Sequence, residues 1–158
     1  MVSSKTGKFL LMKKILCIGE ALIDMICTNK GSALSDGNDF LKKPGGAPTN
    51  VAAAIAALGG RVELAAKVGT DPFGRHLLDV MKGFGVGTKH MLQTEKHFTT
   101  FAFVSLMQHG ERDFYFNRGA DAELSQTDCN KIALADLSIV HFGPATGSLK
   151  GPFQNAHS

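Results

Sequence analysis

The chain has 158 residues, a length typical of one domain, and its 44% hydrophobic and 20% charged residues are typical of a soluble globular protein. Its formal charge of +3 comes without a dense Lys/Arg cluster, and no apolar run approaches the roughly 18 residues that span a bilayer, so we expect neither nucleic acid nor membrane as a partner. Three cysteines without a CxxC pair and scattered histidines predict reduced, mostly buried thiols in a cytoplasmic protein without a metal site.

The first predicted element follows an N-terminal extension, residues 1–13. Residues 15–19 form a continuous apolar run, which is typical of a strand that is buried on both faces in a parallel sheet. Further along, Asp24 has apolar neighbours on both sides. Its carboxylate must therefore lie at a strand end, pair with another group, or face a cleft, unless it is simply a solvated aspartate at a sheet edge.

A polar, turn-rich segment at residues 28–39 separates this region from a short predicted strand at residues 40–43. The strand leads directly into Gly45 and Gly46. An excursion of the chain therefore leaves after Asp24 and returns at Gly45, which could bring both residues into one site.

The stretch that follows predicts a slim helix with a glycine-rich entrance. Pro48 suits the first helical turn, the alanine-rich run at residues 51–57 favours helix, and Gly59 and Gly60 supply the stop. Two glycines ahead of such a helix let backbone N–H groups approach a polar ligand, and the Asn50 side chain adds both a donor and an acceptor. The alternative is an ordinary loop followed by a packing helix.

The middle of the chain predicts a core strand and an amphipathic helix. Residues 61–69 read as the strand; Asp71 can cap the next helix, and Pro72 fits its first position. Apolar residues at helical spacing then form a core-facing stripe, which ends near residues 83–85.

An aromatic β-hairpin is predicted next, with strands at residues 98–106 and 112–118. Alternation places Phe114 and Phe116 on one face. Arg118 closes the hairpin, either as a surface charge or as a clamp for an anionic or polyhydroxy ligand. A short helix at residues 127–135 and a further buried strand at residues 138–143 complete the elements that we expect.

Taken together, these motifs resemble the PfkB (ribokinase-like) carbohydrate kinases, nearest the fructokinase branch, over about residues 14–158. The family's N-terminal signature combines glycines, a small residue or proline, and an asparagine at fixed spacing. The residues that satisfy it are Gly45, Gly46, Pro48, Asn50, Ala52, Gly59 and Gly69. The stretches Gly-Thr-Asp-Pro-Phe-Gly at residues 69–74 and Glu-Arg-Asp-Phe at residues 111–114 also fit fructokinases.

The resemblance implies a three-layer α/β sandwich with a small β-sheet lid, whose segments would be about residues 25–44 and 98–118. It also implies the substrate-binding residues: Asp24, Gly45, Gly46 and Asn50 would hold sugar hydroxyls, and Arg118 would grip the sugar from the lid. Many fructokinases have Tyr-Arg where this chain has Asn117 and Arg118, which leaves the choice of sugar open. Fructose is the first expectation, with 2-keto-3-deoxygluconate or a nucleoside as alternatives, and the family allows a homodimer through the lid.

The family's C-terminal signature, Asp-Thr-x-Gly-Ala-Gly-Asp, does not occur in these 158 residues. In the family it supplies the catalytic base and most of the site for ATP and Mg²⁺. We therefore expect a truncated kinase domain, residues 14–158, that carries the sugar-binding half and no catalytic residue, and that is inactive alone. The competing hypotheses are a non-catalytic module that binds a sugar or a partner, and an unstable fragment.

Overall fold

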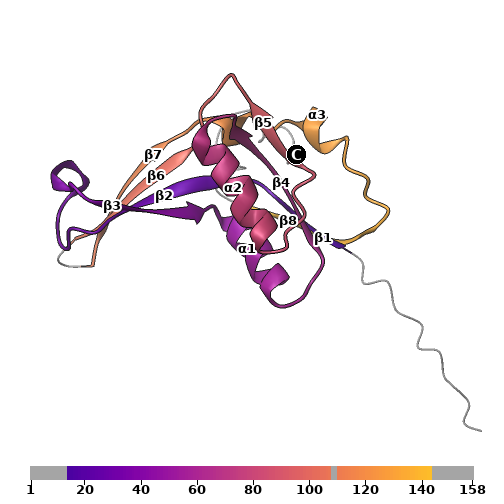
Figure 1. The fold of residues 1–158 in the computed structure, drawn as a ribbon, viewed down its shortest axis with the longest axis horizontal. Coiled ribbons are helices and arrows are strands. Elements are labelled where there is room, and N and C mark those ends of the chain that lie inside the picture. Colours follow the sequence, from indigo (N-terminus) through magenta and orange to yellow (C-terminus); the bar gives the residue numbers. More distant parts are fainter. Residues whose placement is uncertain (1–13, 108–109, 144–158) are drawn as a thin grey trace, which may run out of the picture.

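The computed structural model describes residues 14–107 and 110–143. The predicted extension at residues 1–13 lies outside these ranges. The described residues form a body of parallel strands and helices, from which a second sheet projects to one side (Figure 1). None of the helices in the described ranges is long and apolar enough to cross a membrane.

The body is built on a parallel sheet. Its strand order is β5 (Met91–Thr94), β4 (Val62–Gly69), β1 (Lys14–Ile18) and β8 (Leu137–Phe142). Neighbouring strands all run in the same direction. The predicted strands at residues 15–19 and 61–69 are thereby confirmed, whereas β5 was not anticipated.

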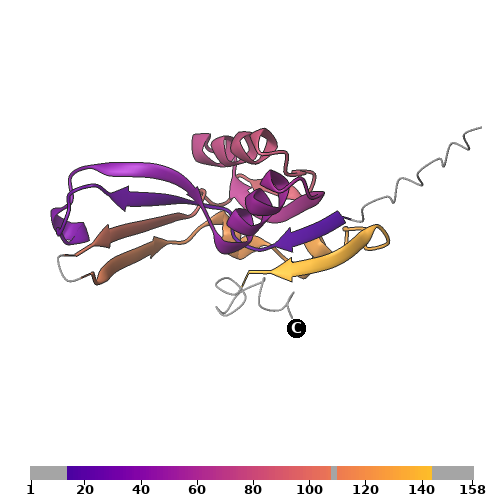
Figure 2. The same ribbon diagram turned by 90° about the horizontal axis from the view of Figure 1, so that it is seen from below.

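Helices α1 (Ala47–Ala57) and α2 (Pro72–Gly83) lie on one face of the parallel sheet (Figure 2). Cys17 and Leu64 point into the core on this face. Leu16 and Ala65 point to the opposite face, where they pack against Leu124 beyond the short helix η2 (Ala120–Glu123). After Lys14, strand β1 is apolar, as expected for a strand that is covered from both sides.

The lid sheet has the strand order β3 (Phe40–Gly45), β2 (Leu22–Cys27), β6 (Phe101–Leu106) and β7 (Arg112–Asn117). Strands β6 and β7 form the predicted antiparallel hairpin, and β2 and β3 form a second antiparallel pair. The parallel pairing of β2 with β6 joins the two pairs. A short helix, η1 (Leu34–Asp36), lies between β2 and β3.

Two helix boundaries agree closely with the sequence prediction. Pro48 lies in the first turn of α1, and Gly59 follows the helix with a φ of +81°. The Asp71 carboxylate caps α2 by accepting hydrogen bonds from the backbone N–H groups of Phe73 and Gly74, both at 2.9 Å.

Two expectations near the end of the described ranges were wrong. The predicted helix at residues 127–135 is a single turn, α3 (Gln126–Cys129), because Ile132 turns back to pack on the sheet. Strand β8 is not buried: Ile139 is 55% exposed and Phe142 is 41% exposed. Of the described strands, only β1 pairs with β8, so β8 is an edge strand.

Candidate functional site

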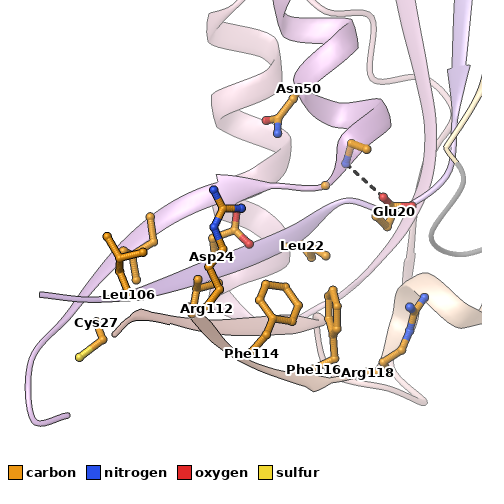
Figure 3. Close-up of a pocket in the computed structure, with 14 residues that line it drawn as sticks. Glu20, Leu22, Asp24, Cys27, Asn50, Leu106, Arg112, Phe114, Phe116 and Arg118 are labelled. Atoms are coloured by element: carbon orange, nitrogen blue, oxygen red, sulfur yellow. Dashed lines mark hydrogen bonds between the residues drawn. The ribbon is translucent and has the colours of Figure 1, made fainter. Parts of the chain in front are cut away.

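A pocket of about 680 Å³ lies between the N-terminus of α1 and the inner face of the lid sheet (Figure 3). Its polar lining comes from the segment after β1, from β2, from the first turn of α1 and from β7. Its apolar lining comes from the lid strands. The lining residues used below are Glu20, Leu22, Asp24, Ile26, Gly46, Asn50, Leu106, Arg112, Phe114, Phe116 and Arg118.

Asp24 and Gly45 meet at this pocket, as the predicted excursion of the chain required. Asp24 is opposite Lys43 in the β2–β3 pair, and Leu22 is opposite Gly45. A Cβ atom at Gly45 would lie only 2.3 Å from Asp24 Oδ2, so glycine leaves room for the carboxylate. Asp24 is partly buried, and this burial raises the pKa of its carboxyl above the ordinary value.

Gly46 and Glu20 shape the entrance to α1. Gly46 has a φ of +104°, and a Cβ atom there would lie 2.3 Å from the Glu20 backbone oxygen. The Glu20 carboxylate accepts a hydrogen bond from the Ala47 backbone N–H at 3.1 Å, and the Glu20 carbonyl accepts one from the Thr49 hydroxyl at 2.8 Å. The sequence suggested N–H groups held open for a ligand; the structure shows that Glu20 already binds one of them.

Asn50 projects from the first turn of α1 toward the pocket (Figure 3). Its backbone N–H continues the helix by donating to the Gly46 carbonyl at 2.9 Å. The residue is exposed, so its side-chain amide can both donate to and accept from a ligand in the pocket.

Arg118 lies on the opposite side of the pocket and is not a simple surface charge. Its side chain is 23% exposed, and its Nη2 atom donates to Oδ2 of Asp121, which is buried. Thr100 donates to the other oxygen of Asp121 through its hydroxyl, and the Gly119 backbone N–H donates to that hydroxyl at 2.8 Å. A buried network therefore holds Arg118 at the end of β7.

The pKa of Asp121 is raised above its ordinary value by burial, and the nearby negative charge of Glu20 acts in the same direction. Hydrogen bonding by Thr100 and the positive charge of Arg118 oppose this rise. Asp121 is thus a buried carboxyl group that lies near both the Arg118 guanidinium group and the Glu20 carboxylate.

The lid contributes an apolar wall to the pocket. Phe114 and Phe116 share one face of β7, as the alternation predicted, with ring centroids 4.5 Å apart. They are 48% and 39% exposed, and Leu106 beside them is 59% exposed. An exposed apolar wall opposite polar groups suits a ligand with both hydroxyl groups and C–H faces.

The structure brings the predicted residues Asp24, Gly46, Asn50 and Arg118 around one pocket, with Gly45 against Asp24. Residue patterns alone did not single out Glu20 or Arg112. Glu20 follows a buried parallel strand, and such carboxyl ends are where sites of open α/β sheets form, so a signal was present. Arg112 shares a face of β7 with Phe114 and Phe116 by strand alternation, so a signal was present there too, although the pattern does not say which face turns toward the pocket.

The described residues contain no group of three His, Cys, Asp or Glu side chains placed to hold a metal ion. The carboxylate of Glu20, the most buried one lining the pocket, is bound to the Ala47 N–H. The pocket in the described ranges therefore offers separate carboxylates rather than a cluster of metal ligands.

The pfkB family carbohydrate kinase model matches residues 12–156. The chain belongs to this family. Among curated relatives, probable fructokinase-5 from Arabidopsis thaliana is 38% identical over 145 residues, which cover 90% of this chain and 44% of that protein. The fructokinase of Solanum tuberosum is 36% identical over 153 residues, covering 96% of this chain and 48% of the relative. The chain thus spans less than half the length of these relatives.

Solved structures show the same relationship. Halothermothrix orenii fructokinase superposes with a TM-score of 0.81 at 29% identity, covering 91% of this chain and 51% of that one. A sugar kinase from Pyrococcus horikoshii in complex with ATP gives a TM-score of 0.77 at 32% identity, covering 90% and 47%. The fold is therefore the ribokinase-like α/β fold with a lid, represented by about half of its length, and the family is one of phosphotransferases.

Proposed function

We propose that this chain provides the sugar-binding part of a kinase that transfers a phosphoryl group from ATP to a hydroxyl of fructose. The observation that carries the proposal is the pocket between α1 and the lid, whose lining brings Asp24, Asn50 and Arg118 together with the apolar side chains of Phe114 and Phe116. The printed names of the similar proteins, several of them fructokinases, support fructose as the sugar.

Each polar residue has a distinct role in this proposal. The Asp24 carboxyl and the Asn50 amide bind neighbouring sugar hydroxyls, and Gly45 leaves the carboxyl room to do so. Arg118 donates to a further oxygen from the lid side. Phe114 and Phe116 pack on the C–H face of the sugar and exclude water, which would otherwise compete as the phosphoryl acceptor.

ATP supplies the phosphoryl group, and Mg²⁺ offsets its charge, in reactions of this class. The similar structure that contains ATP supports ATP as the donor. We assign the described residues sugar binding and orientation only, because the family's C-terminal signature, which the resemblance links to the catalytic base and the ATP site, does not occur in these 158 residues. We therefore expect the purified 158-residue chain to release no ADP from Mg-ATP and fructose in a coupled assay. Clear turnover would show that the chain is catalytically complete.

Sugar binding itself is tested by calorimetry with fructose, 2-keto-3-deoxygluconate and nucleosides. Asn50→Ala removes the amide from the pocket and should weaken fructose binding by about tenfold, the usual loss for a polar group that is left unpaired. Gln126→Ala removes an exposed amide elsewhere and should leave the affinity unchanged. An unchanged affinity for fructose in the Asn50→Ala variant would contradict the proposed site.

A non-catalytic sugar-binding module is the second candidate, favoured by a pocket that these residues shape without a metal site. Sugar binding without ADP release by any longer form of the protein would support the non-catalytic module over the kinase.

We also propose a homodimer through the lid, supported by the exposed Leu106, Phe114 and Tyr115. A monomer at all concentrations in sedimentation equilibrium would exclude this dimer.

We also propose the cytoplasm as the location of the chain. The free thiols Cys17, Cys27 and Cys129 support it.

A further inference from the structure

The charge of Arg118 is already offset before any ligand enters the pocket. One of its terminal nitrogens donates to Asp121, a carboxyl that is only 1% exposed. Its Nε atom is buried and has no hydrogen-bond partner among the described residues. One terminal nitrogen thus pairs the positive charge of Arg118 with Asp121, and donor capacity toward a ligand rests with the other terminal N–H groups of the guanidinium.

Buried hydrogen bonds on the side away from Arg118 fix the position of the Asp121 carboxyl. The Thr100 hydroxyl donates to the oxygen of Asp121 that does not bind Arg118. Thr100 is fully buried, and its hydroxyl in turn accepts from the Gly119 N–H at 2.8 Å. Asp121 thus cannot turn away from Arg118 without leaving buried polar groups unpaired, which is costly.

Once Arg118 is paired with Asp121, the other charged side chains that line the pocket do not give it a net positive charge. Glu20 and Asp24 line it as carboxylates, and Arg112 and Arg118 line it as guanidinium groups. With Asp121 directly behind Arg118, three carboxyl groups lie near two guanidinium groups, and the further cation Lys43, opposite Asp24 on β3, is exposed to solvent. Arg112 is exposed at the outer end of β7, where solvent screens its charge. The buried end of the pocket is therefore unfavourable for an anion.

We propose that Asp121 makes the pocket selective for uncharged polyhydroxy ligands over the corresponding sugar acids, by neutralising Arg118 while leaving its N–H groups free to donate. The proposal rests on the sugar site proposed above and narrows its substrate class. Asp121 does not touch the ligand in this scheme; it is a positioning residue that acts through Arg118.

The test compares two ligands with one carbon skeleton, fructose and 2-keto-gluconate, which carries a carboxylate in place of the terminal C1 hydroxymethyl group. Both are titrated into the full chain by heteronuclear NMR. Wild type should prefer fructose. Asp121→Asn should shift the affinity ratio toward the acid by about tenfold, because Arg118 then presents an unpaired charge. Asp79→Asn makes the same charge change on an exposed part of α2 and should leave the ratio unchanged.

The double variant Asp121→Asn/Arg118→Gln should lose the gained acid affinity, which a general loosening of the pocket would not reproduce. Should Asp121→Asn fail to fold, the salt dependence of wild type decides the question. Screening of repulsion strengthens acid binding as NaCl rises from about 0.02 to 0.3 M, whereas a free Arg118 charge would make the same binding weaker.

The outcomes separate the two proposals. Fructose binding with an unchanged ratio in Asp121→Asn, or acid binding that salt weakens or leaves unaltered in wild type, overturns the role of Asp121 alone. Binding of neither ligand to wild type overturns the sugar site and this inference with it.

Discussion

At the scale of single residues, two glycines with positive φ differ in what surrounds them. Gly46 at +104° lies against the Glu20 backbone oxygen, whereas Gly59 at +81° has no atom within 4 Å of its hypothetical Cβ. A side chain at either position would strain the left-handed backbone, but only at Gly46 would it also clash with a fixed backbone atom. Comparing the two positions therefore separates the two contributions to destabilisation.

We expect Gly46→Ala to lower the free energy of unfolding by at least about 2 kcal/mol, because a backbone atom cannot yield as a flexible side chain can. Gly59→Ala carries only the conformational strain and should cost about 1 kcal/mol. Urea unfolding followed by circular dichroism measures both. Equal losses in the two variants would mean that the contact with Glu20 contributes nothing.

At the scale of elements, Asp71 joins helix α2 to the start of the lid. Besides capping the helix, its carboxylate accepts hydrogen bonds from the Thr99 backbone N–H at 2.7 Å and from the Thr99 hydroxyl at 2.9 Å. Burial alone would raise the pKa of Asp71, but the hydrogen bonds from Thr99, Gly74 and Phe73 outweigh it and lower the pKa below 3.8. The cap is therefore an ionised group that connects two elements.

Asp71→Ala should destabilise the chain by about 2 kcal/mol at pH 7, since it removes a cap and the bonds to Thr99. A lowered folded-state pKa contributes stability above the unfolded-state value, and this contribution is lost as the pH falls through the folded-state pKa. The difference between wild type and variant should thus shrink below about pH 4. Urea unfolding at several pH values measures it. Asp79→Ala, an exposed change on the same helix, should stay within about 0.5 kcal/mol throughout.

Sequence patterns foretold most elements but not every one. Strand β5 (Met91–Thr94) was missed because four residues are too few for a period-two pattern, and its pairing with β4 depends on the turn after α2. The α3 prediction was too long because residues 127–135 have helical composition, whereas contacts of Ile132 with the sheet end the helix early.

At the scale of the whole molecule, burial is uneven. Strands β1 and β4 are enclosed by helices on one face and by the segment around Leu124 on the other. Strand β8 and the lid strand β7 are edge strands with largely exposed side chains. Stability should follow this difference, since opening free energy depends on local burial.

Amide hydrogen exchange should therefore be slowest in β1 and β4 and fastest in β7 and β8. Uniformly fast exchange in β1 and β4 would show that the chain has no stable core, which is the unstable-fragment hypothesis. Mass spectrometry of peptides after timed exchange resolves the two cases. The pattern also bears on the site, because Asn50 lies on α1 of the protected body, whereas Asp24 lies on an inner strand of the lid and Arg112 on its edge strand.

The sequence by itself determined the buried parallel strands β1 and β4, the helices α1 and α2, the hairpin and the family. These features depend on apolar periodicity, on glycine and proline, and on capping groups that act over a few neighbouring residues. It also placed Asp24 beside Gly45, because a polar excursion between two strands returns the chain to its start. Only the tertiary structure decided that Glu20 occupies the entrance of α1, that the face of β7 with Arg112 turns toward the pocket, that buried Thr100 binds the Asp121 carboxyl that pairs with Arg118, and that β8 is exposed. Those outcomes depend on strand register and on contacts between sheet, helix and lid, which no local pattern encodes.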